Sequence, residues 1–540
     1  MPNPPTPTTK SPKHQPPQDL PQAARALLAL LLAGPFVLLF FLGQSHLALS
    51  FDSYVYLLLA QSLAQGEGFY LGGSPHAFFS PAYPALIALI SLSGISTVWA
   101  AQGLSAFCLS LSIALMVWLA WRAWGSWQTG LLAAGLLLAS GRVQQYGLTV
   151  WAENLLAPLY LAAVLCALPQ RGKLGSASWY GLSGFMAAAW YGKPEGLVIF
   201  LGLWLGKLFS PALDASAAYW AWPGRRTWLH AGLALLLFVS LLIPGVAWNA
   251  QATGKLALSP KKNAILLWAH EVHTGGDPKW ALREAPPENP CQDLGEYYRR
   301  LVRLPAQSFD YSWTEIADNA LSIPIEYGFK YFGPLTGLLV LGSCVLLLRR
   351  KASVLRILFI PTALIYAYSI VLYDELRFFL PVLPLLCLQA AFLVQSLAHR
   401  LGGMRGARRM WAMLLLILCL ITEGPGWWAL KEPAQSPLWL EPPAELTAAV
   451  QTGRVASNHA GAAYLTGAKR MIMIPSLRSP QALWQFTQQC QVHTVLLITD
   501  GSVPSGLQAL EASPRFALQA RYPIEPAHGI ELLVAHPSGP

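Results

Sequence analysis

Long apolar runs separated by short polar clusters constrain this chain more than any other feature of its sequence. A helix of about 20 apolar residues can cross a membrane, and several runs here approach that length. Only 11% of the residues are charged, whereas a soluble protein carries about 25%. We therefore expect a polytopic membrane protein. The net charge of +10 does not indicate nucleic acid, because Lys and Arg gather between the runs, where they set orientation.

The basic clusters predict which segments cross the membrane. They lie near Arg171, Arg225, Arg349 and Arg405, and all can face the cytoplasm only if one early segment does not cross. The best candidate is 81–95, because it is short and carries two prolines, so we expect a helix in or against the interface. About 11 transmembrane helices remain. The apolar segments are 25–48, 81–95, 98–121, 128–141, 153–168, 179–192, 194–209, 229–249, 333–348, 353–373, 378–398 and 411–428.

The predicted fold class is an all-α polytopic membrane protein with a small C-terminal α/β domain. Residues 1–24 are rich in proline and predict a disordered cytoplasmic tail. Residues 25–429 form the transmembrane domain, with outer loops at 49–97 and 250–332. In 430–540, short apolar strands alternate with helical stretches, which indicates an extracytoplasmic α/β domain. Cys291 and Cys490 both fall in outer regions, and whether they pair is left open.

Asp52 is the first candidate for chemistry. It follows the first apolar run by a few residues, which places a carboxylate at the outer membrane surface beside apolar walls. A general base needs that position if its substrate arrives partly in lipid. Tyr56 shares the helical face of Asp52. The simpler alternative is that Asp52 caps a helix that starts at Ser53.

Two further charged positions lie at predicted outer ends of apolar runs. Glu153 heads such a run, and an acid there is costly in lipid and becomes a functional candidate; alternatively it only stabilises a helix N-terminus. Lys193-Pro194-Glu195-Gly196 interrupts another apolar stretch, where Lys193 could meet a lipid phosphate. The alternative is a local Lys193–Glu195 pair that ends two spans.

Other polar groups are expected on the same outer side. Arg377, between two late spans, is a candidate ligand for a carrier phosphate or for an acceptor; the alternative is interface snorkelling. His76, in the first outer loop, faces the same outer region and is a further candidate. The basic stretch 259–263 is either an acceptor contact or a surface turn. His270 and His273 stand three apart rather than the four that a zinc helix needs, so no metal ligands are assigned.

The first outer loop resembles a known family. An acidic residue after one span is followed by Tyr-x-Tyr-Leu, by Gly-x-Gly-Phe, and by Ser-Pro-x-Tyr-Pro, which contains Tyr83. This order is similar to that of membrane glycosyltransferases of the C-type fold, nearest to the bacterial protein-mannosyltransferase-like and lipid A aminoarabinose transferase-like groups. Arg377 and the Lys193 motif fit the family pattern, with Lys193 and Phe378 replacing the more usual Arg and Tyr. Ser53 stands where many members carry a second acid.

The resemblance implies an inverting transfer from a polyprenyl-phosphate sugar, with Asp52 as base and Glu153 as second acid at the outer face of the plasma membrane. Lys193, Glu195, Arg377, Tyr56, His76 and Tyr83 are the expected substrate-binding residues. The acceptor is a glycan, a lipid or a protein, and no cofactor is required by the pattern, although a divalent metal is left open. The alternative is a lipid or sugar transporter, which would carry charges at mid-span and inverted repeats. A ligase that transfers a whole glycan would use similar loops.

Overall fold

The computed structural model describes most of the helical region and most of the C-terminal sheet. It covers residues 29–37, 49–140, 143, 147, 149–168, 173–209, 223–273, 291–304, 320, 353–371, 376–401, 454–458, 460–466, 471–474, 480–500, 513–525 and 530–537. The predicted tail 1–24 and the apolar segments 333–348 and 411–428 lie outside these residues. The count of about 11 transmembrane helices therefore stays a prediction.

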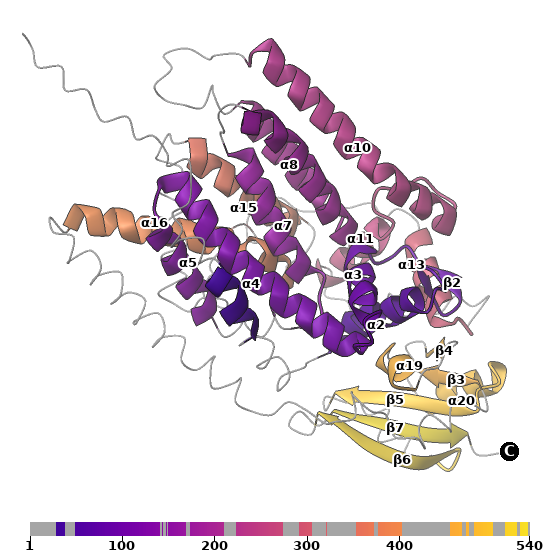
Figure 1. Cartoon of the computed structure of the whole chain (residues 1–540). Helices are drawn as coiled ribbons and strands as arrows, with labels where there is room; N and C mark the ends of the chain where they lie inside the picture. Colours follow the sequence, from indigo (N-terminus) through magenta and orange to yellow (C-terminus); the bar gives the residue numbers. More distant parts are fainter. Residues whose placement is uncertain are drawn as a thin grey trace, which may run out of the picture.

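Several of the described helices lie side by side and form a bundle (Figure 1). By length and composition, Thr97–Trp124, Arg225–Thr253 and Arg377–Ser396 could each cross a membrane, and shorter apolar helices accompany them. The helices are α2 (Phe51–Ala64), α3 (Ala82–Ser91), α4 (Thr97–Trp124), α5 (Trp127–Ala139), α7 (Glu153–Ala167), α8 (Lys173–Gly192), α9 (Gly196–Leu208), α10 (Arg225–Thr253), α11 (Lys262–His273), α13 (Leu294–Arg303), α15 (Ser353–Val371), the 3₁₀ helix η2 (Leu376–Val382) and α16 (Leu383–Leu401).

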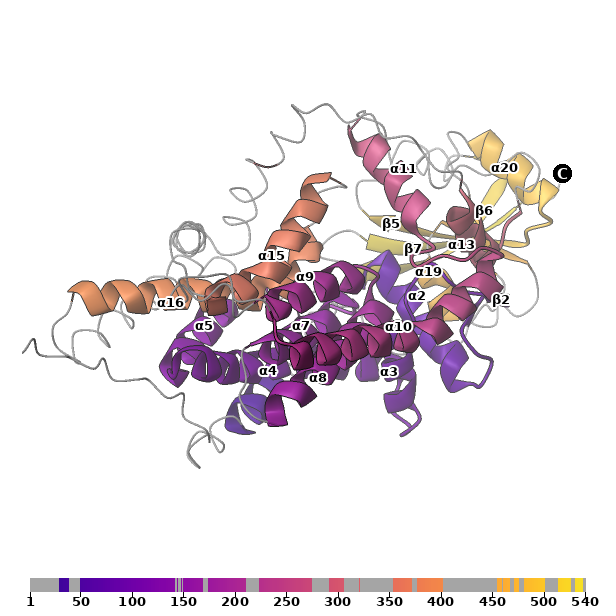
Figure 2. The same ribbon diagram turned by 90° about the horizontal axis from the view of Figure 1, so that it is seen from above.

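Close backbone approach holds the centre of this bundle together. One apolar core joins α4, α5, α7, α8, α9 and α16. At Gly130 in α5, an added Cβ would lie 2.4 Å from the Cα of Val117 in α4, so only glycine allows this crossing. By contrast, α10 lies along α8 (Figures 1 and 2) and leaves large apolar side chains such as Leu236 and Ile243 exposed. An exposed apolar helix face of this kind suits lipid.

Residues 81–95 contain only the short helix α3. It spans Ala82–Ser91, begins after Pro81 and buries Tyr83 and Ile87. A helix of this length is too short to cross a bilayer. Its assignment as an interface helix remains a prediction.

Where the structure describes it, the C-terminal part contains one five-stranded sheet and two helices. The strands are β3 (Val455–Ser457), β4 (Met471–Met473), β5 (Thr494–Asp500), β6 (Phe516–Glu525) and β7 (Ile530–Pro537), in the order β4-β3-β5-β7-β6. β3 runs parallel to β4 and β5, whereas β7 is antiparallel to β5 and β6. Helices α19 (Ala460–Thr466) and α20 (Pro480–Gln489) connect the parallel strands.

The sheet lies at the end of the bundle where α2 and α13 are found (Figures 1 and 2). A second apolar core joins these two helices to residues of β3, β4, β5, β7 and α19. The hydroxyl of Tyr464 in α19 lies 3.0 Å from that of Thr97. Cys291 and Cys490, whose pairing the sequence left open, form a disulfide. The C-terminal part is therefore packed against the segment that carries Asp52 and covalently joined to the start of α13.

Candidate active site

Asp52 lies in the first turn of α2. The helix is capped by Ser50, whose side chain accepts from the Ser53 amide at 3.3 Å, while the Ser53 hydroxyl accepts from the Ser50 amide at 3.1 Å. The expectation that Asp52 caps a helix beginning at Ser53 is therefore wrong. Because Ser50 and Ser53 perform the capping, the Asp52 carboxylate is available for other contacts.

Glu153 and Lys193 form a buried ion pair. The Lys193 Nζ lies 2.5 Å from the Glu153 Oε1, and the two side chains are 8% and 2% exposed. Lys193 is delivered by the turn between α8 and α9, and its ammonium also lies 4.2 Å from the centre of the Phe378 ring. The alternative of a local Lys193–Glu195 pair is thus wrong, because Lys193 pairs across the bundle.

Arg377 joins the two predicted acids. Its Nη1 lies 2.5 Å from the Asp52 Oδ2, and its Nε lies 3.8 Å from the Glu153 Oε1. The guanidinium also lies 5.6 Å from the Trp151 ring. The short helix η2 turns the side chain inward, where it is 19% exposed. Simple snorkelling into the interface does not describe this position.

These four charged side chains line one cavity of about 230 Å³. Its walls come from α2, the start of α7, the α8–α9 turn, α11, α13 and η2. Tyr56 also lines it, with an edge-on ring 5.0 Å from that of Phe79. Burial, and next the nearby Glu153 carboxylate, raise the pKa of the Tyr56 phenol. Tyr56 therefore keeps its proton and can donate a hydrogen bond.

The remaining predicted residues lie beside this cavity rather than on its lining. Tyr83 is buried, and its hydroxyl lies 2.7 Å from that of Ser105. Glu195 lines a neighbouring apolar cavity of about 250 Å³ between α9, α11 and α15. The two cavities share the side chain of Ile265.

His76 is buried behind the cavity wall. Its Nε2 accepts a hydrogen bond from the Phe79 amide at 3.0 Å, and burial lowers the pKa of the imidazole to about 3. The ring is therefore neutral and holds Phe78 and Phe79, both of which line the cavity. A substrate-binding role for His76 stays a prediction.

Two further features of the cavity were not selected as site residues from the sequence. Lys261 lines both this cavity and a third one of about 220 Å³ between α8 and α10. Burial lowers the pKa of its ammonium. Helix α13 contributes Tyr297, Tyr298 and Leu301. The basic stretch 259–263 drew attention to Lys261, but nothing in the sequence indicated which way α13 faces.

The charged residues of the cavity were also compared with the ligand clusters that hold metal ions. Across the described residues, no three His, Cys, Asp or Glu side chains gather closely enough to hold a metal ion. Asp52 and Glu153 are each neutralised by a cation.

Comparison with known proteins identifies the fold. Residues 328–423 match the model of the Alg9-like mannosyltransferase family, a segment that contains Arg377. The structure is similar to that of ArnT from Cupriavidus metallidurans bound to undecaprenyl phosphate, with a TM-score of 0.59 and 12% identity, covering 96% of this chain and 100% of that one. The apo structure of the same protein gives 0.56 at the same identity and coverage.

This chain has the C-type glycosyltransferase fold. The resemblance inferred from the first loop is thus confirmed, and the family match bears out the prediction of a glycosyltransferase. An oligosaccharyltransferase from Archaeoglobus fulgidus, in complex with Zn and sulfate, is more distant, with a TM-score of 0.48, 12% identity and coverage of 83% of this chain and 64% of that one. No curated protein sequence matches the chain.

Proposed function

We propose that this C-type fold protein is an inverting glycosyltransferase that moves a sugar from a polyprenyl phosphate to an acceptor hydroxyl at the outer face of the membrane. The observation that carries the proposal is the shared cavity. It brings the Asp52 carboxylate together with Lys193, Lys261 and Arg377, beside the apolar cavity that Glu195 borders. A carboxylate, several cations and an apolar neighbour match the three parts of the reaction: acceptor hydroxyl, phosphate and isoprenoid.

The apolar cavity is suited to the part of the isoprenoid nearest the phosphate. Val198, Ile199, Leu364 and Ile365 line it, and it meets the charged cavity at Ile265. A lipid chain there would leave its phosphate among the cations. The ArnT structure of the same fold was solved with undecaprenyl phosphate, which supports this class of donor.

Lys261 is the cation best prepared to receive a phosphate. Lys193 and Arg377 both have carboxylate partners, but in the described part of the chain Lys261 forms no ion pair. The half-buried Lys261 ammonium has lost part of its hydration, which favours an incoming anion, and the lowered pKa of Lys261 reflects that loss. A phosphate would relieve it, so Lys261 joins Lys193 and Arg377 as a proposed phosphate contact.

The Asp52–Arg377 pair couples donor binding to base activation. A bound phosphate competes with Asp52 for the guanidinium, since both are anions that arginine binds well. Once Arg377 turns toward the phosphate, the carboxylate is free to accept a proton. Glu153 remains with Lys193 and helps to keep Arg377 in place, 3.8 Å from its Nε.

The transfer step needs no chemical group beyond the donor, the acceptor and the residues of the cavity. The acceptor oxygen attacks the anomeric carbon from the side opposite the phosphate, and its proton passes to Asp52. The bond between the anomeric carbon and the phosphate oxygen breaks, and its electron pair leaves on polyprenyl phosphate. The cations stabilise the charge that develops there. Attack from the opposite side inverts the anomeric centre.

The disulfide supports the proposed orientation. Cys291, just before α13, is bonded to Cys490 in the C-terminal part, and disulfides persist in oxidising compartments rather than in the cytoplasm. This agrees with an outer position for the loop at 250–332, for the C-terminal part and for Asp52, in a protein of the inner (plasma) membrane.

The transporter alternative predicts a different arrangement of charge. A transporter of the expected kind would bind its substrate among charged groups near mid-membrane. The charged residues of this cavity instead lie at helix ends and turns, namely the starts of α2, α7 and α11 and the α8–α9 turn.

The function is tested by incubating purified protein in lipid vesicles with a panel of polyprenyl-phosphate sugars and candidate glycan, lipid and protein acceptors. We expect release of free polyprenyl phosphate with at least one donor, accompanied by a glycosylated acceptor of inverted anomeric configuration. Movement of intact donor across the bilayer, with no release, would instead support a transporter.

A further inference from the structure

Helix α13 forms a wall of the catalytic cavity. Tyr297, Tyr298 and Leu301 line it. The ring of Tyr298 packs 5.0 Å from that of Phe78 and 5.4 Å from that of Phe79, two other lining residues. The position of α13 therefore decides how well this side of the cavity is closed.

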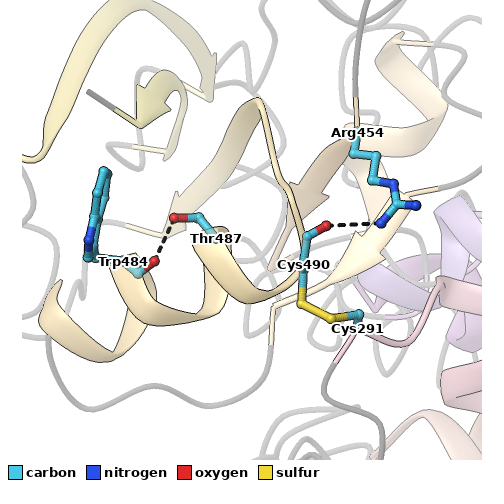
Figure 3. Close-up of a disulfide and its surroundings, with 5 residues drawn as sticks. All are labelled: Cys291, Arg454, Trp484, Thr487 and Cys490. Atoms are coloured by element: carbon cyan, nitrogen blue, oxygen red, sulfur yellow. Dashed lines mark hydrogen bonds between the residues drawn. A yellow bond between two sulfur atoms is a disulfide. The ribbon is translucent and has the colours of Figure 1, made fainter. Parts of the chain in front are cut away.

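The start of α13 is attached to the C-terminal part of the chain. Cys291 forms the disulfide with Cys490, at the end of α20 (Figure 3). The next residue, Gln292, accepts a hydrogen bond from the Met473 amide of β4 at 2.9 Å. Cys490 is itself held, because its carbonyl accepts from the Arg454 guanidinium at 3.2 Å (Figure 3). The disulfide thus joins α13 to an ordered sheet.

The other contacts of α13 leave little room for a different position. Gly295 packs against the first loop so closely that an added Cβ would lie 2.1 Å from the Leu71 carbonyl oxygen. The Asp293 side chain caps the helix by accepting from the Glu296 amide at 2.7 Å. Beyond the last turn, the Asn263 amide group donates to the Leu304 carbonyl at 2.6 Å. The disulfide adds a covalent bond to these non-covalent contacts of α13.

We propose that Cys291 and Cys490 are positioning residues for sugar transfer: their disulfide holds α13 closed against the catalytic cavity and thereby excludes water from the bound donor. This inference rests on the proposed function. A closed wall matters because water competes with the acceptor for the same anomeric carbon. If α13 loosens, a water oxygen attacks that carbon, its proton passes to Asp52, and the phosphate leaves with the electron pair of the broken bond. The products are free sugar and polyprenyl phosphate.

The test compares wild-type protein with the Cys291→Ser/Cys490→Ser double variant in lipid vesicles, with polyprenyl-phosphate sugar and the acceptor that the transfer assay identifies. We expect the ratio of free sugar to glycosylated acceptor to rise several-fold, together with the KM for the acceptor. Cys166→Ser, which removes a free thiol within α7, is the matched control and should leave both values unchanged. Simple partial unfolding would lower hydrolysis and transfer in proportion, so an unchanged ratio would overturn the proposal.

Gly295→Ala provides a second variant that keeps the disulfide. Its Cβ would press α13 away from the Leu71 carbonyl, and we expect the same change in product ratio. A wild-type ratio in folded Gly295→Ala would contradict the role given to the position of α13.

Amide hydrogen exchange separates this proposal from the proposed function. Exchange over Leu294–Arg303 should be faster in the double variant than in wild-type protein, whether or not the preparation transfers sugar. Faster exchange in a protein that transfers no sugar would support the proposal that the disulfide holds α13 in place, while contradicting the glycosyltransferase function. Unchanged exchange would overturn the proposed role of the disulfide.

Discussion

The two shortest ion pairs of the cavity, Lys193–Glu153 and Arg377–Asp52, have the same N–O distance but different surroundings. Lys193 and Glu153 are 8% and 2% exposed, whereas Arg377 and Asp52 are 19% and 25% exposed, and each pair measures 2.5 Å. A charge left alone in a buried pair is strongly destabilising, whereas a partly solvated partner can be exchanged at lower cost. The more buried Lys193–Glu153 pair, the inner pair, therefore suits a fixed role. The more exposed Arg377–Asp52 pair, the outer pair, suits exchange of its carboxylate for an incoming phosphate.

Neutralising the outer acid should have the largest effect. Asp52→Asn preserves the shape of the side chain but removes the base, so we expect sugar transfer to fall about 10²–10⁴-fold. Thermal stability should change little, because Ser50 and Ser53, not Asp52, cap α2. Rates of polyprenyl phosphate release measure the effect, with Glu67→Gln, an exposed acid in the same loop, as the control. Near-native turnover in Asp52→Asn would leave Asp52 with only an electrostatic role toward Arg377.

Neutralising the inner acid should act first on stability. Glu153→Gln leaves the Lys193 ammonium buried without a carboxylate partner at 2.5 Å, which costs about 3–5 kcal/mol for a buried pair. The measurement is thermal unfolding in detergent. The double variant Glu153→Gln/Lys193→Met removes both charges and should recover part of the loss. If the single variant is as stable as wild-type protein, the contrast between the two pairs fails.

Lys261 extends the comparison of the two ion pairs, because its proposed partner is the phosphate of the donor rather than a carboxylate of the protein. Lys261→Gln should weaken binding of polyprenyl phosphate about tenfold, the value of a charge-assisted hydrogen bond, whereas Lys255→Gln, in the same loop and exposed, should not. Since burial lowers the pKa of Lys261, the ammonium loses its proton, and phosphate affinity falls, at a lower pH than for an exposed lysine. Lys261→Arg keeps its charge and should retain affinity as pH rises. Identical pH profiles for wild type and Lys261→Arg would exclude this role.

Sequence reasoning located the charged residues but not their partners. Asp52, Glu153, Lys193 and Arg377 could be selected because charges at the ends of apolar runs are costly. Their pairing could not be predicted: Asp52 and Arg377 are 325 residues apart, and Glu153 and Lys193 are 40 apart. Local alternatives, a cap at Asp52 and a Lys193–Glu195 pair, therefore looked equally good.

Contacts between segments that are distant in the sequence set the position of His76 and the attachment of the C-terminal region, and neither could be predicted. His76 is predicted among the substrate contacts, and the sequence did not indicate that Phe79 and Tyr298 would pack around its ring behind the cavity wall. The alternation of short strands and helices indicated the C-terminal β3-α19-β4-α20-β5 order. It could not indicate that this region is joined to α13 by the Cys291–Cys490 disulfide, because the spacing of the two cysteines fits no known pattern.

The central claim is that the carboxylate of residue 52 lies on the outer side of the membrane, in a cavity that binds the phosphate of the carrier lipid. The most direct measurement is labelling of Asp52→Cys in oriented membranes with a thiol reagent that does not cross the bilayer, with wild-type protein as background. We expect labelling from the outside, and protection by added polyprenyl phosphate. Labelling only from the cytoplasmic side, or outside labelling that polyprenyl phosphate does not reduce, would contradict the claim.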